Sequence, residues 1–284
     1  MDIKATDIKN LREKTGAGMM DCKKALVEAE GNFIAAEKLL REWGMAGVEK
    51  RSGRATNEGR IFFAGDAAAL AVVEIACETD FVAKNEDFIS SGSKIAQKAL
   101  SKKAKSGDEE LEGMVKEIAS VIKENIALKR VMYFEAKPGE YLHHYVHGEG
   151  KLVVVIRAAS ASAATFKNET VKGFVHDIAL HVAAFNPMFL DQSKPESAWV
   201  KEQQEIFAKQ VELDEKMSNK PAKVIEGILA GKLKKLMAEI CLMDQGFVKD
   251  EKLSVSAALA AVKKETGTDF AIADYSYVKV GDAI

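Results

Sequence analysis

The stretch IFFAGDAAALAVVEIAC, residues 61–77, decides the fold class of this 284-residue chain. The apolar residues at positions 61–64 and 70–77 predict two β-strands, and the Gly-Asp pair between them predicts a turn. A stripe of apolar residues at helical spacing follows over residues 88–100. A β-hairpin of this kind is expected to bury one face under the helix that follows it.

The same order of elements recurs later in the chain. Residues 141–147 predict a strand, a Gly-Glu-Gly turn follows, and residues 151–158 predict a second strand. From Thr170 onward, apolar residues at helical spacing form one stripe. We therefore expect an α+β protein whose core contains two repeated subdomains, each an antiparallel β-sheet covered by helices.

The first 43 residues predict three short helices separated by glycines. Thr6 is expected to cap the first helix and Asp21 the second, while the third starts at Asn32 and ends before Gly44. Residues 44–60 lack an apolar period and are rich in glycine and basic residues, which predicts a linker. The three helices together make a bundle that is marginally stable alone.

A helical hairpin is expected near the C-terminus. Apolar residues between Trp199 and Met217 step by three and four, residues 219–221 break the helix, and a second stripe runs from Ile225 to Ile240. Two helices alone have a thin apolar seam. The hairpin therefore either protrudes to engage another chain or lies along the body of the protein.

The remaining residues complete the predicted domain organisation. A helix capped by Ser254 and a strand over residues 270–280 are expected to follow the hairpin, with the strand returning to one of the sheets. The predicted boundaries are 1–44 for the three-helix domain, 45–60 for the linker, 61–140 and 141–197 for the two core subdomains, 198–245 for the helical hairpin, and 246–284 for the C-terminal helix and strand.

Composition narrows the classes of partner. The chain has 41 Lys plus Arg against 43 Asp plus Glu, and this net charge of −2 argues against a purely electrostatic partner such as RNA or anionic lipid. No apolar run approaches the length of a membrane span, and charges occupy the N-terminus where a secretory signal would be apolar. Three separated cysteines fit a reducing compartment. We expect a cytoplasmic protein.

Motifs for catalysis and cofactor binding are missing. No phosphate-binding loop and no dinucleotide-binding glycine pattern is present, so direct nucleotide binding is not expected. His143 and His147 would share one face of a strand, but no further ligand completes a metal site. Cys77 ends an apolar strand, which favours a core position over a nucleophile. We therefore expect no metal, no cofactor and no covalent chemistry, with a metal-dependent enzyme at the histidines as an alternative.

Two stretches have the composition of contact surfaces. In residues 15–26, TGAGMMDCKKAL, Met19 and Met20 are expected on the flexible connection between two helices, as docking groups or as core residues. In residues 79–88, TDFVAKNEDF, Asp80 and Phe81 fall on a turn between strand and helix. A phenylalanine there is either tucked under its own turn or presented to a partner.

Five motifs together resemble the elongation factor Ts family, the guanine nucleotide exchange factors of elongation factor Tu. They are TGAGMMDCKKAL at residues 15–26, CETDFVAKNEDF at 77–88, ENIALKR at 124–130, YVHGEGKLVVVI at 145–156 and EGILAGKLKKL at 226–236. The resemblance implies an N-terminal ubiquitin-associated-like domain of three helices, a core of two repeated subdomains and a protruding antiparallel coiled coil. Some members carry a further C-terminal helical module, which is not expected after Val280.

The resemblance also implies the partner and the contact residues. The partner is elongation factor Tu in its GDP-bound and nucleotide-free states, and the hairpin raises a homodimer as an alternative assembly. Residues 79–82, namely Thr79, Asp80, Phe81 and Val82, match the segment that disturbs the magnesium and phosphate site of the partner. The implied partner-binding positions are Arg12, Met19, Met20, Lys23, Asp80, Phe81, Ile126 and His147.

An exchange factor must bind the nucleotide-free partner more tightly than the nucleotide-bound one. We expect Phe81 to act as a wedge whose apolar burial becomes available only when the partner has released its nucleotide. A competing hypothesis is an RNA-associated scaffold, which the basic linker and three Lys-Lys pairs suggest. Acidic residues are interleaved with those pairs, which argues against it.

Overall fold

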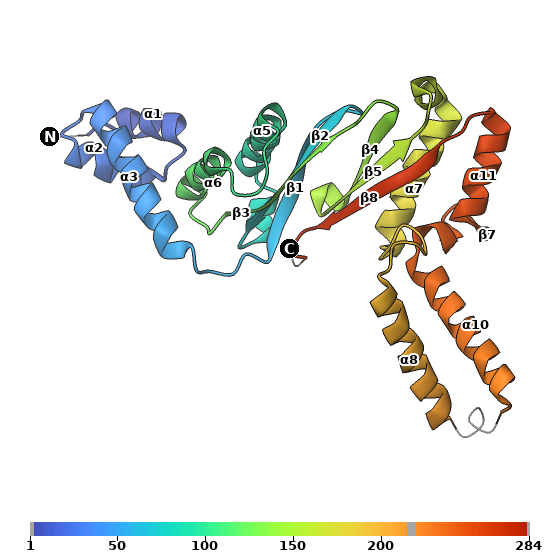
Figure 1. Ribbon diagram of the computed structural model, residues 1–284. Helices are drawn as coiled ribbons and strands as arrows, with labels where there is room; N and C mark the ends of the chain where they lie inside the picture. Colours follow the sequence, from blue (N-terminus) through green and yellow to red (C-terminus); the bar gives the residue numbers. More distant parts are fainter. Residues whose placement is uncertain (1–2, 215–219, 283–284) are drawn as a thin grey trace. The chain divides into compact units, whose positions relative to one another are not determined.

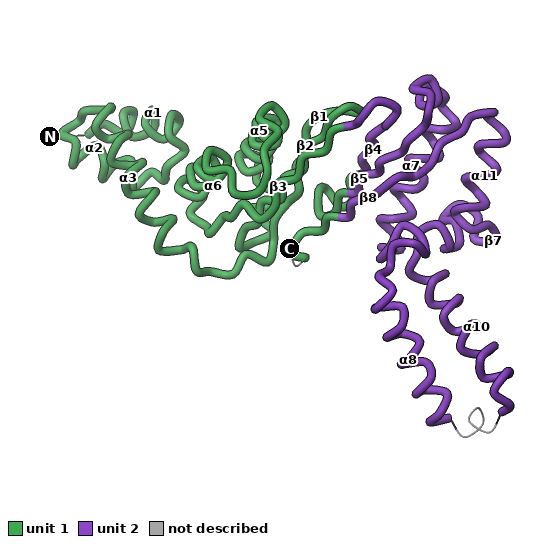
Figure 2. Tube along the Cα trace, viewed as in Figure 1, with its two compact units in different colours: residues 1–135, 146–153, 278–284 green, residues 136–145, 154–277 purple. Residues whose placement is uncertain are grey.

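The computed structural model describes residues 3–214 and 220–282. Its helices and small β-sheets place it in the α+β class, as predicted. The chain divides into two compact units, which are described separately: unit 1 contains residues 1–135, 146–153 and 278–284, and unit 2 contains residues 136–145 and 154–277 (Figure 2). Among the described residues, no helix is long and apolar enough to cross a membrane.

Unit 1 begins with three helices, α1 (Ala5–Thr15), α2 (Met19–Glu28) and α3 (Phe33–Arg51). The predicted caps at Thr6 and Asp21 are wrong, because Lys4 and Gly18 precede the first helical residues, while Asn32 caps α3 as expected by accepting from the Ala35 N–H. Asp21 instead lies in the first turn of α2, where a negative charge interacts favourably with the helix dipole. The three helices enclose their own apolar cluster, with Leu11, Cys22, Ala25, Leu26 and Ala36 at its centre.

The sequence predicts that the third helix ends before Gly44. This prediction is wrong, because α3 continues to Arg51. Its first half packs in the cluster of the three helices, whereas Val48 packs against the core of the first β-sheet. A Cβ atom at Gly44 would lie 2.8 Å from the Cβ of Ser120 in α6 (Glu109–Ile122). Gly44 therefore permits two helices to approach closely, and only residues 52–57 connect α3 to the first strand.

The first sheet contains β1 (Glu58–Gly65), β2 (Ala69–Cys77) and β3 (Ala127–Glu135), in the order β1-β2-β3 with antiparallel pairing. In the structure, Phe62 of β1 pairs opposite Val73 of β2. The sequence predicts the β1-β2 hairpin but not β3. The reason is that β3 carries charged residues and lies at the edge of the sheet, so most of its positions are only partly buried.

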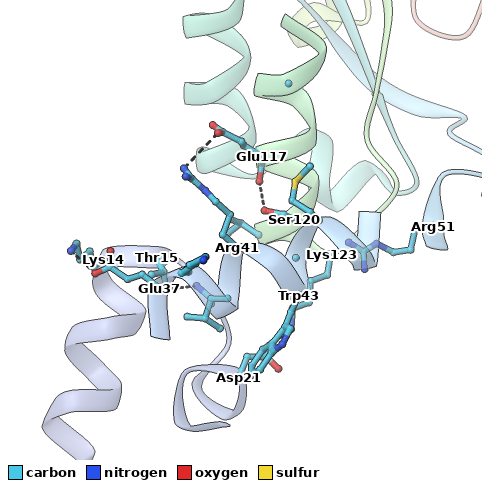
Figure 3. Close-up of a pocket in the computed structure, with 17 residues that line it drawn as sticks. Lys14, Thr15, Asp21, Glu37, Arg41, Trp43, Arg51, Glu117, Ser120 and Lys123 are labelled. Carbon is cyan, nitrogen blue, oxygen red and sulfur yellow. Dashed lines mark hydrogen bonds and ion pairs between the residues drawn. The ribbon is translucent and has the colours of Figure 1, made fainter. Parts of the chain in front are cut away.

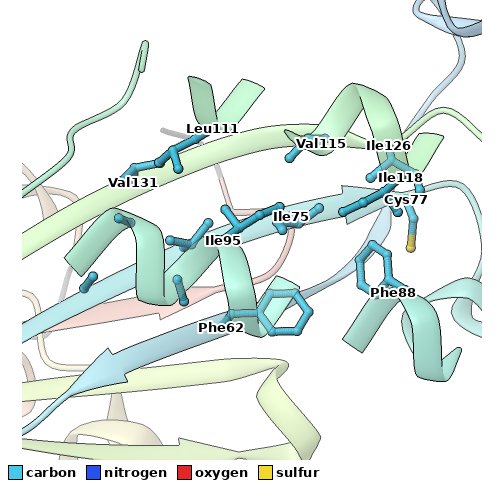
Figure 4. Packing of buried hydrophobic residues seen from close by; sticks show 14 of the residues in the cluster. Phe62, Ile75, Cys77, Phe88, Ile95, Leu111, Val115, Ile118, Ile126 and Val131 are labelled. Atoms are coloured by element: carbon cyan, nitrogen blue, oxygen red, sulfur yellow. The ribbon is translucent and has the colours of Figure 1, made fainter. Parts of the chain in front are cut away.

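Helices α5 (Glu86–Lys102) and α6 pack on this sheet. Asn85 and Asp108 cap them, each accepting hydrogen bonds from backbone N–H groups of the first turn. The core between the helices and the sheet is continuous (Figure 4), and the rings of Phe62 and Phe88 lie 5.7 Å apart at its centre. The four-residue helix α4 (Asp80–Ala83) joins β2 to α5 at the edge of this core.

The second sheet contains β4 (Glu140–His147), β5 (Leu152–Ala159) and β8 (Ala271–Lys279), in the order β4-β5-β8. The C-terminal strand therefore returns to a sheet, as predicted. Helix α7 (Glu169–Phe185) buries the apolar stripe expected from the sequence. The 3₁₀ turns η1 (Gly148–Gly150) and η2 (Ala163–Lys167) connect these elements.

Helices α8 (Ser197–Leu213) and α10 (Ala222–Ile240) form the expected hairpin and extend side by side away from the sheet of unit 2 (Figure 1). Among their described residues, Val211 and Met237 are the buried ones, so the seam is thin. Met217 and Asn219, predicted at the end of the seam and in the break, lie outside the described residues. Ser254 caps α11 (Val255–Thr266) as predicted, after η3 (Leu242–Asp244), β6 (Gly246–Phe247) and β7 (Asp250–Ser254).

The close approach of α3 and α6 predicts opposite effects for two Gly-to-Ala substitutions. Gly44→Ala places a methyl group against Ser120, whereas the position of a Cβ at Gly113 in α6 has no atom within 4 Å. Alanine is favoured over glycine inside a helix by about 1 kcal/mol. We expect Gly113→Ala to raise the free energy of unfolding by up to about that amount, and Gly44→Ala to lower it. Urea denaturation followed by circular dichroism measures both, and equal stabilisation by the two variants would contradict the packing at Gly44.

Candidate partner-binding site

The side chain of Phe81 is held outward on helix α4, with 81% of its surface exposed. The next two residues, Val82 and Ala83, are buried in the core of the first sheet. Thr79 caps the helix, since its hydroxyl accepts a hydrogen bond of 3.3 Å from the Val82 N–H. One side of this single turn is therefore anchored, and the other side presents an aromatic ring to solvent. The alternative in which Phe81 tucks under its own turn is wrong.

Asp80, beside the ring, carries a negative charge. Lys84 donates a hydrogen bond of 2.9 Å to the Asp80 carboxylate, and this bond lowers the pKa of Asp80. The charge of Lys151 lowers it further. Lys151 directly follows the η1 turn, so this positive charge comes from the turn of the second hairpin, which belongs to unit 1 together with α4.

The segment around His147 is fixed to the first strand. His147 is exposed at the end of β4, and the turn that follows it is bound to β1 through Arg60, which donates to the backbone carbonyl of Glu149, and through the Lys151–Glu58 ion pair. Ile126 behaves differently from the other predicted contact residues, since it is 5% exposed and belongs to the same core cluster as Val82 and Ala83. It supports the surface from within.

The N-terminal helices present a second exposed surface. Met19 and Met20 open α2 instead of lying on the connection before it, and they are 42% and 76% exposed. The core alternative for these residues is therefore wrong. Lys23, one turn further along α2, and Arg12 on α1 are also exposed. The exposed residues of these helices thus include two flexible thioether side chains and two basic side chains.

The three N-terminal helices contact α6 and the residue after it. Lys123 forms an ion pair with Asp21, Arg41 lies 3.7 Å from the Glu117 carboxylate, and Arg51 donates a hydrogen bond of 3.1 Å to the Ala119 carbonyl. A cavity of about 980 Å³ lies between these elements, and Figure 3 shows the charged side chains that line it. These contacts fix the position of the three N-terminal helices on α6 within unit 1.

No group of three or more potential metal ligands occurs among the described residues. His143 packs toward α7, where its Nε2 lies 3.0 Å from Nδ1 of His176, and burial lowers the pKa of His143 to about 4. Cys77 is buried, its thiol donates to the Thr79 carbonyl at 3.2 Å, and burial raises its pKa to about 12. A neutral, buried thiol is a poor nucleophile, so the core assignment of Cys77 is confirmed.

Comparison with known proteins identifies the family. The model of the family described as "Elongation factor TS" matches residues 78–282. The chain is 44% identical over 282 residues to elongation factor Ts of Treponema denticola, covering 99% of both chains. It is 40% identical to elongation factor Ts of Borrelia hermsii over 99% of this chain and 100% of that one, and 42% identical to that of Treponema pallidum (strain Nichols) over 94% of both.

The chain belongs to the elongation factor Ts family. The resemblance carried by the five sequence motifs is thereby confirmed. Members of the elongation factor Ts family are translation elongation factors that act as guanine nucleotide exchange factors, without covalent chemistry.

The sequence analysis missed Glu124, the residue that binds the segment just before the Phe81 turn. Glu124 lies within the motif ENIALKR, yet nothing in its spacing indicated a role. In the structure its carboxylate accepts hydrogen bonds from the Glu78 and Thr79 N–H groups and from the Thr79 hydroxyl. The signal in the sequence was the acidic residue itself, just after an apolar helix and just before a buried isoleucine.

The buried thiol of Cys77 gives a test by chemical modification. Because the pKa rises from 9.0 to about 12, the thiolate fraction at pH 8 falls about a thousandfold relative to an ordinary cysteine. Cys22 and Cys241 are buried as well. We expect the native protein to resist iodoacetamide at pH 8 and the urea-unfolded protein to react at all three cysteines, as mass spectrometry would show. Rapid alkylation of native Cys77 would return it to the candidate nucleophiles.

Proposed function

We propose that this chain binds elongation factor Tu and accelerates the release of GDP, so that GTP can bind in its place. The observation that carries this proposal is the exposed ring of Phe81 on a capped and anchored turn. A phenyl ring that is 81% exposed has no role in the core of its own chain. Family membership supports elongation factor Tu as the partner.

The mechanism is differential binding. Phe81 enters a site that opens near the magnesium and phosphates of the partner when the nucleotide leaves, and residues 79–82 form the segment that disturbs the magnesium. Burial of a phenylalanine side chain contributes roughly 1.5–3 kcal/mol, which corresponds to about 10- to 100-fold in rate. By reciprocity, GDP weakens the binding of this chain by the same factor.

Asp80 gives the wedge a charge. The hydrogen bond from Lys84 lowers the pKa of the Asp80 carboxyl group further below neutral pH. An anion beside the ring repels phosphate and attracts magnesium, and both effects favour departure of the nucleotide. His147 forms a further contact with the partner from the neighbouring turn, and Ile126 contributes by holding the core beneath α4.

The N-terminal helices supply affinity. Arg12, Met19, Met20 and Lys23 dock on the GTPase domain of the partner, and their domain has a ubiquitin-associated-like fold over residues 1–44. Residues 52–57, a shorter connection than the predicted linker of 45–60 because α3 extends to Arg51, join it to two repeated core subdomains, 61–140 and 141–197. The hairpin of residues 198–245 is an antiparallel coiled coil, and residues 246–284 complete the core.

The proposed cycle involves both the GDP-bound and the nucleotide-free partner in the cytoplasm, with no cofactor and no nucleotide bound by this chain. The hairpin helices expose Ile206, Leu213 and Val224. Exposed apolar residues on a thin two-helix seam favour a second copy of this chain as an additional contact, although exchange itself requires one copy of Phe81.

Removal of the ring tests the wedge. Phe81→Ala should slow stimulated release of a fluorescent GDP analogue from elongation factor Tu by about tenfold or more, because the apolar burial is lost. Affinity for the GDP-bound partner should change less, since the ring is buried only after the nucleotide leaves and the N-terminal surface is intact. Phe185→Ala, which removes a half-exposed phenylalanine ring from unit 2, is the control. An unchanged release rate for Phe81→Ala would refute the wedge.

The docking surface is tested separately by Met19→Ala/Met20→Ala. The double variant should weaken binding to elongation factor Tu by about tenfold or more, because it removes two apolar side chains from an interface. The release rate at saturating concentration should stay within about twofold of the parent protein. Ile34→Ala serves as the control, since Ile34 is an exposed apolar residue of the same three helices. Titration calorimetry measures the affinities, and an equal loss for Ile34→Ala would argue against a specific methionine surface.

A further inference from the structure

The turn after α6 brings one carboxylate to the base of the Phe81 segment. Lys123 adopts a left-handed conformation with φ 67° and ends the helix, which aims Glu124 back toward the end of β2. Oε2 of Glu124 lies 3.1 Å from both the Glu78 N and the Thr79 N, and Oε1 lies 2.7 Å from the Thr79 hydroxyl. Three donors thus converge on a single side chain from a segment 45 or more residues away in sequence.

These hydrogen bonds occur where the sheet no longer provides partners. Cys77 is the last residue of β2 to pair with β1, so the N–H groups of Glu78 and Thr79 lie beyond that ladder. A buried N–H group without a partner costs about 1–3 kcal/mol. The Glu124 carboxylate supplies that partner for both peptides and so defines the direction in which the chain leaves β2.

Thr79 links the Glu124 carboxylate to helix α4. The Thr79 hydroxyl donates its proton to Glu124. The lone pairs of the Thr79 oxygen remain free to accept a hydrogen bond from the Val82 N–H, and this second bond caps α4. A helix of four residues is too short to form by its own propensity. Its geometry therefore depends on the cap and on the burial of Val82 and Ala83.

Asn125 also contacts the segment before α4, and it binds the residues after α3. Its backbone N–H donates a hydrogen bond of 2.6 Å to Glu78, whose carboxylate also lies 3.3 Å from Arg54. The Asn125 amide donates to the carbonyls of Ser52 and Arg54. The Glu78 carboxylate is therefore paired with Arg54, and the segment before α4 is bound by both Glu124 and Asn125.

We propose that Glu124 is a positioning residue for Phe81: its carboxylate fixes the Glu78–Thr79 peptides and the Thr79 hydroxyl so that the ring leaves the surface in one direction. This inference rests on the proposed function. Without the carboxylate, the α4 turn samples more conformations, and the partner must order it on binding. Glu124 thus acts on exchange through Phe81, without touching the partner itself.

The structural part of this proposal is tested on the free protein. Glu124→Ala should increase amide hydrogen exchange in residues 80–83 while α5 stays protected. Glu110→Ala is the matched control, since it removes another carboxylate of the same unit that binds Lys98 and Lys102 at the surface. Glu124→Gln keeps one oxygen acceptor and should show a smaller increase. Unchanged exchange of residues 80–83 in Glu124→Ala would overturn the proposal.

The functional part is tested by a double-mutant cycle on stimulated GDP release at saturating concentration. Glu124→Ala should slow release about five- to thirtyfold, the range expected for ordering one residue on binding. Glu124→Gln should retain part of the release rate. This variant keeps the test decisive if Glu124→Ala folds poorly. In a Phe81→Ala background, Glu124→Ala should add less than about twofold.

The outcomes separate this proposal from the proposed function. If Phe81→Ala slows release and Glu124→Ala does not, the positioning role is refuted while the wedge stands. If the two losses multiply, Glu124 acts independently of Phe81 and the positioning role is refuted as well. If Phe81→Ala leaves release unchanged, the wedge itself is refuted.

Discussion

The burial of Val82 and Ala83 is the constraint on which the exposed surface depends. In a single helical turn, neighbouring residues point in different directions, so fixing two of them in the core fixes the third outside it. Phe81 is exposed because its neighbours are buried, and not because the loop is loose. The hydrogen bonds from Glu78 and Thr79 to Glu124 complete this arrangement by fixing where the turn begins.

A second constraint links the two contact surfaces of unit 1. Helix α3 takes part in two apolar cores, with its first half in the N-terminal cluster and Val48 in the cluster of the first sheet. A flexible linker would raise the effective concentration of one surface near the other, but the orientation would remain undefined. A continuous helix packed on α6 also defines the orientation, which lowers the entropy lost when both surfaces meet one partner.

The residues 123–125 have a central place in this arrangement. Lys123 forms an ion pair with Asp21 of α2, Glu124 binds the peptides before α4, and Asn125 binds the carbonyls of the segment after α3. Three consecutive side chains thus contact the N-terminal helices, the connecting segment and the turn that carries Phe81. The core of the three helices is small and therefore marginally stable alone. Contacts with the rest of unit 1 add to its stability.

Sequence periodicity predicted the elements whose apolar residues face a single core. The β1-β2 hairpin, the stripe of α7 and the return of β8 to a sheet follow directly from such patterns. It failed where tertiary contacts override the local preference of a residue. Gly44 was interpreted as a helix end, yet it lies inside α3, where Ser120 leaves no room for a side chain. Strand β3 escaped prediction because an edge strand alternates weakly.

The candidate site also has one feature that the sequence predicts and one that it does not. The position of Phe81 outside both apolar stripes could be predicted, since a strand and a helix must be joined there. Its outward direction could not, because that depends on Glu124, which lies 43 residues further along the chain. Hydrogen bonds between segments distant in sequence leave no period in the sequence. A single acidic residue after a helix is compatible with many roles, and only the fold selects one.

The energetic consequence concerns the free protein as much as the complex. An exposed phenyl ring contributes nothing to the stability of its own fold, so its whole apolar burial is available for a partner. Any freedom of the turn would reduce that contribution, because the ring would then have to be ordered on binding. Coupling between sites is limited by the difference in interaction energy between two states of the partner. A rigid turn therefore keeps the full apolar burial of the ring available to a partner, and the turn is held by two buried side chains and one carboxylate.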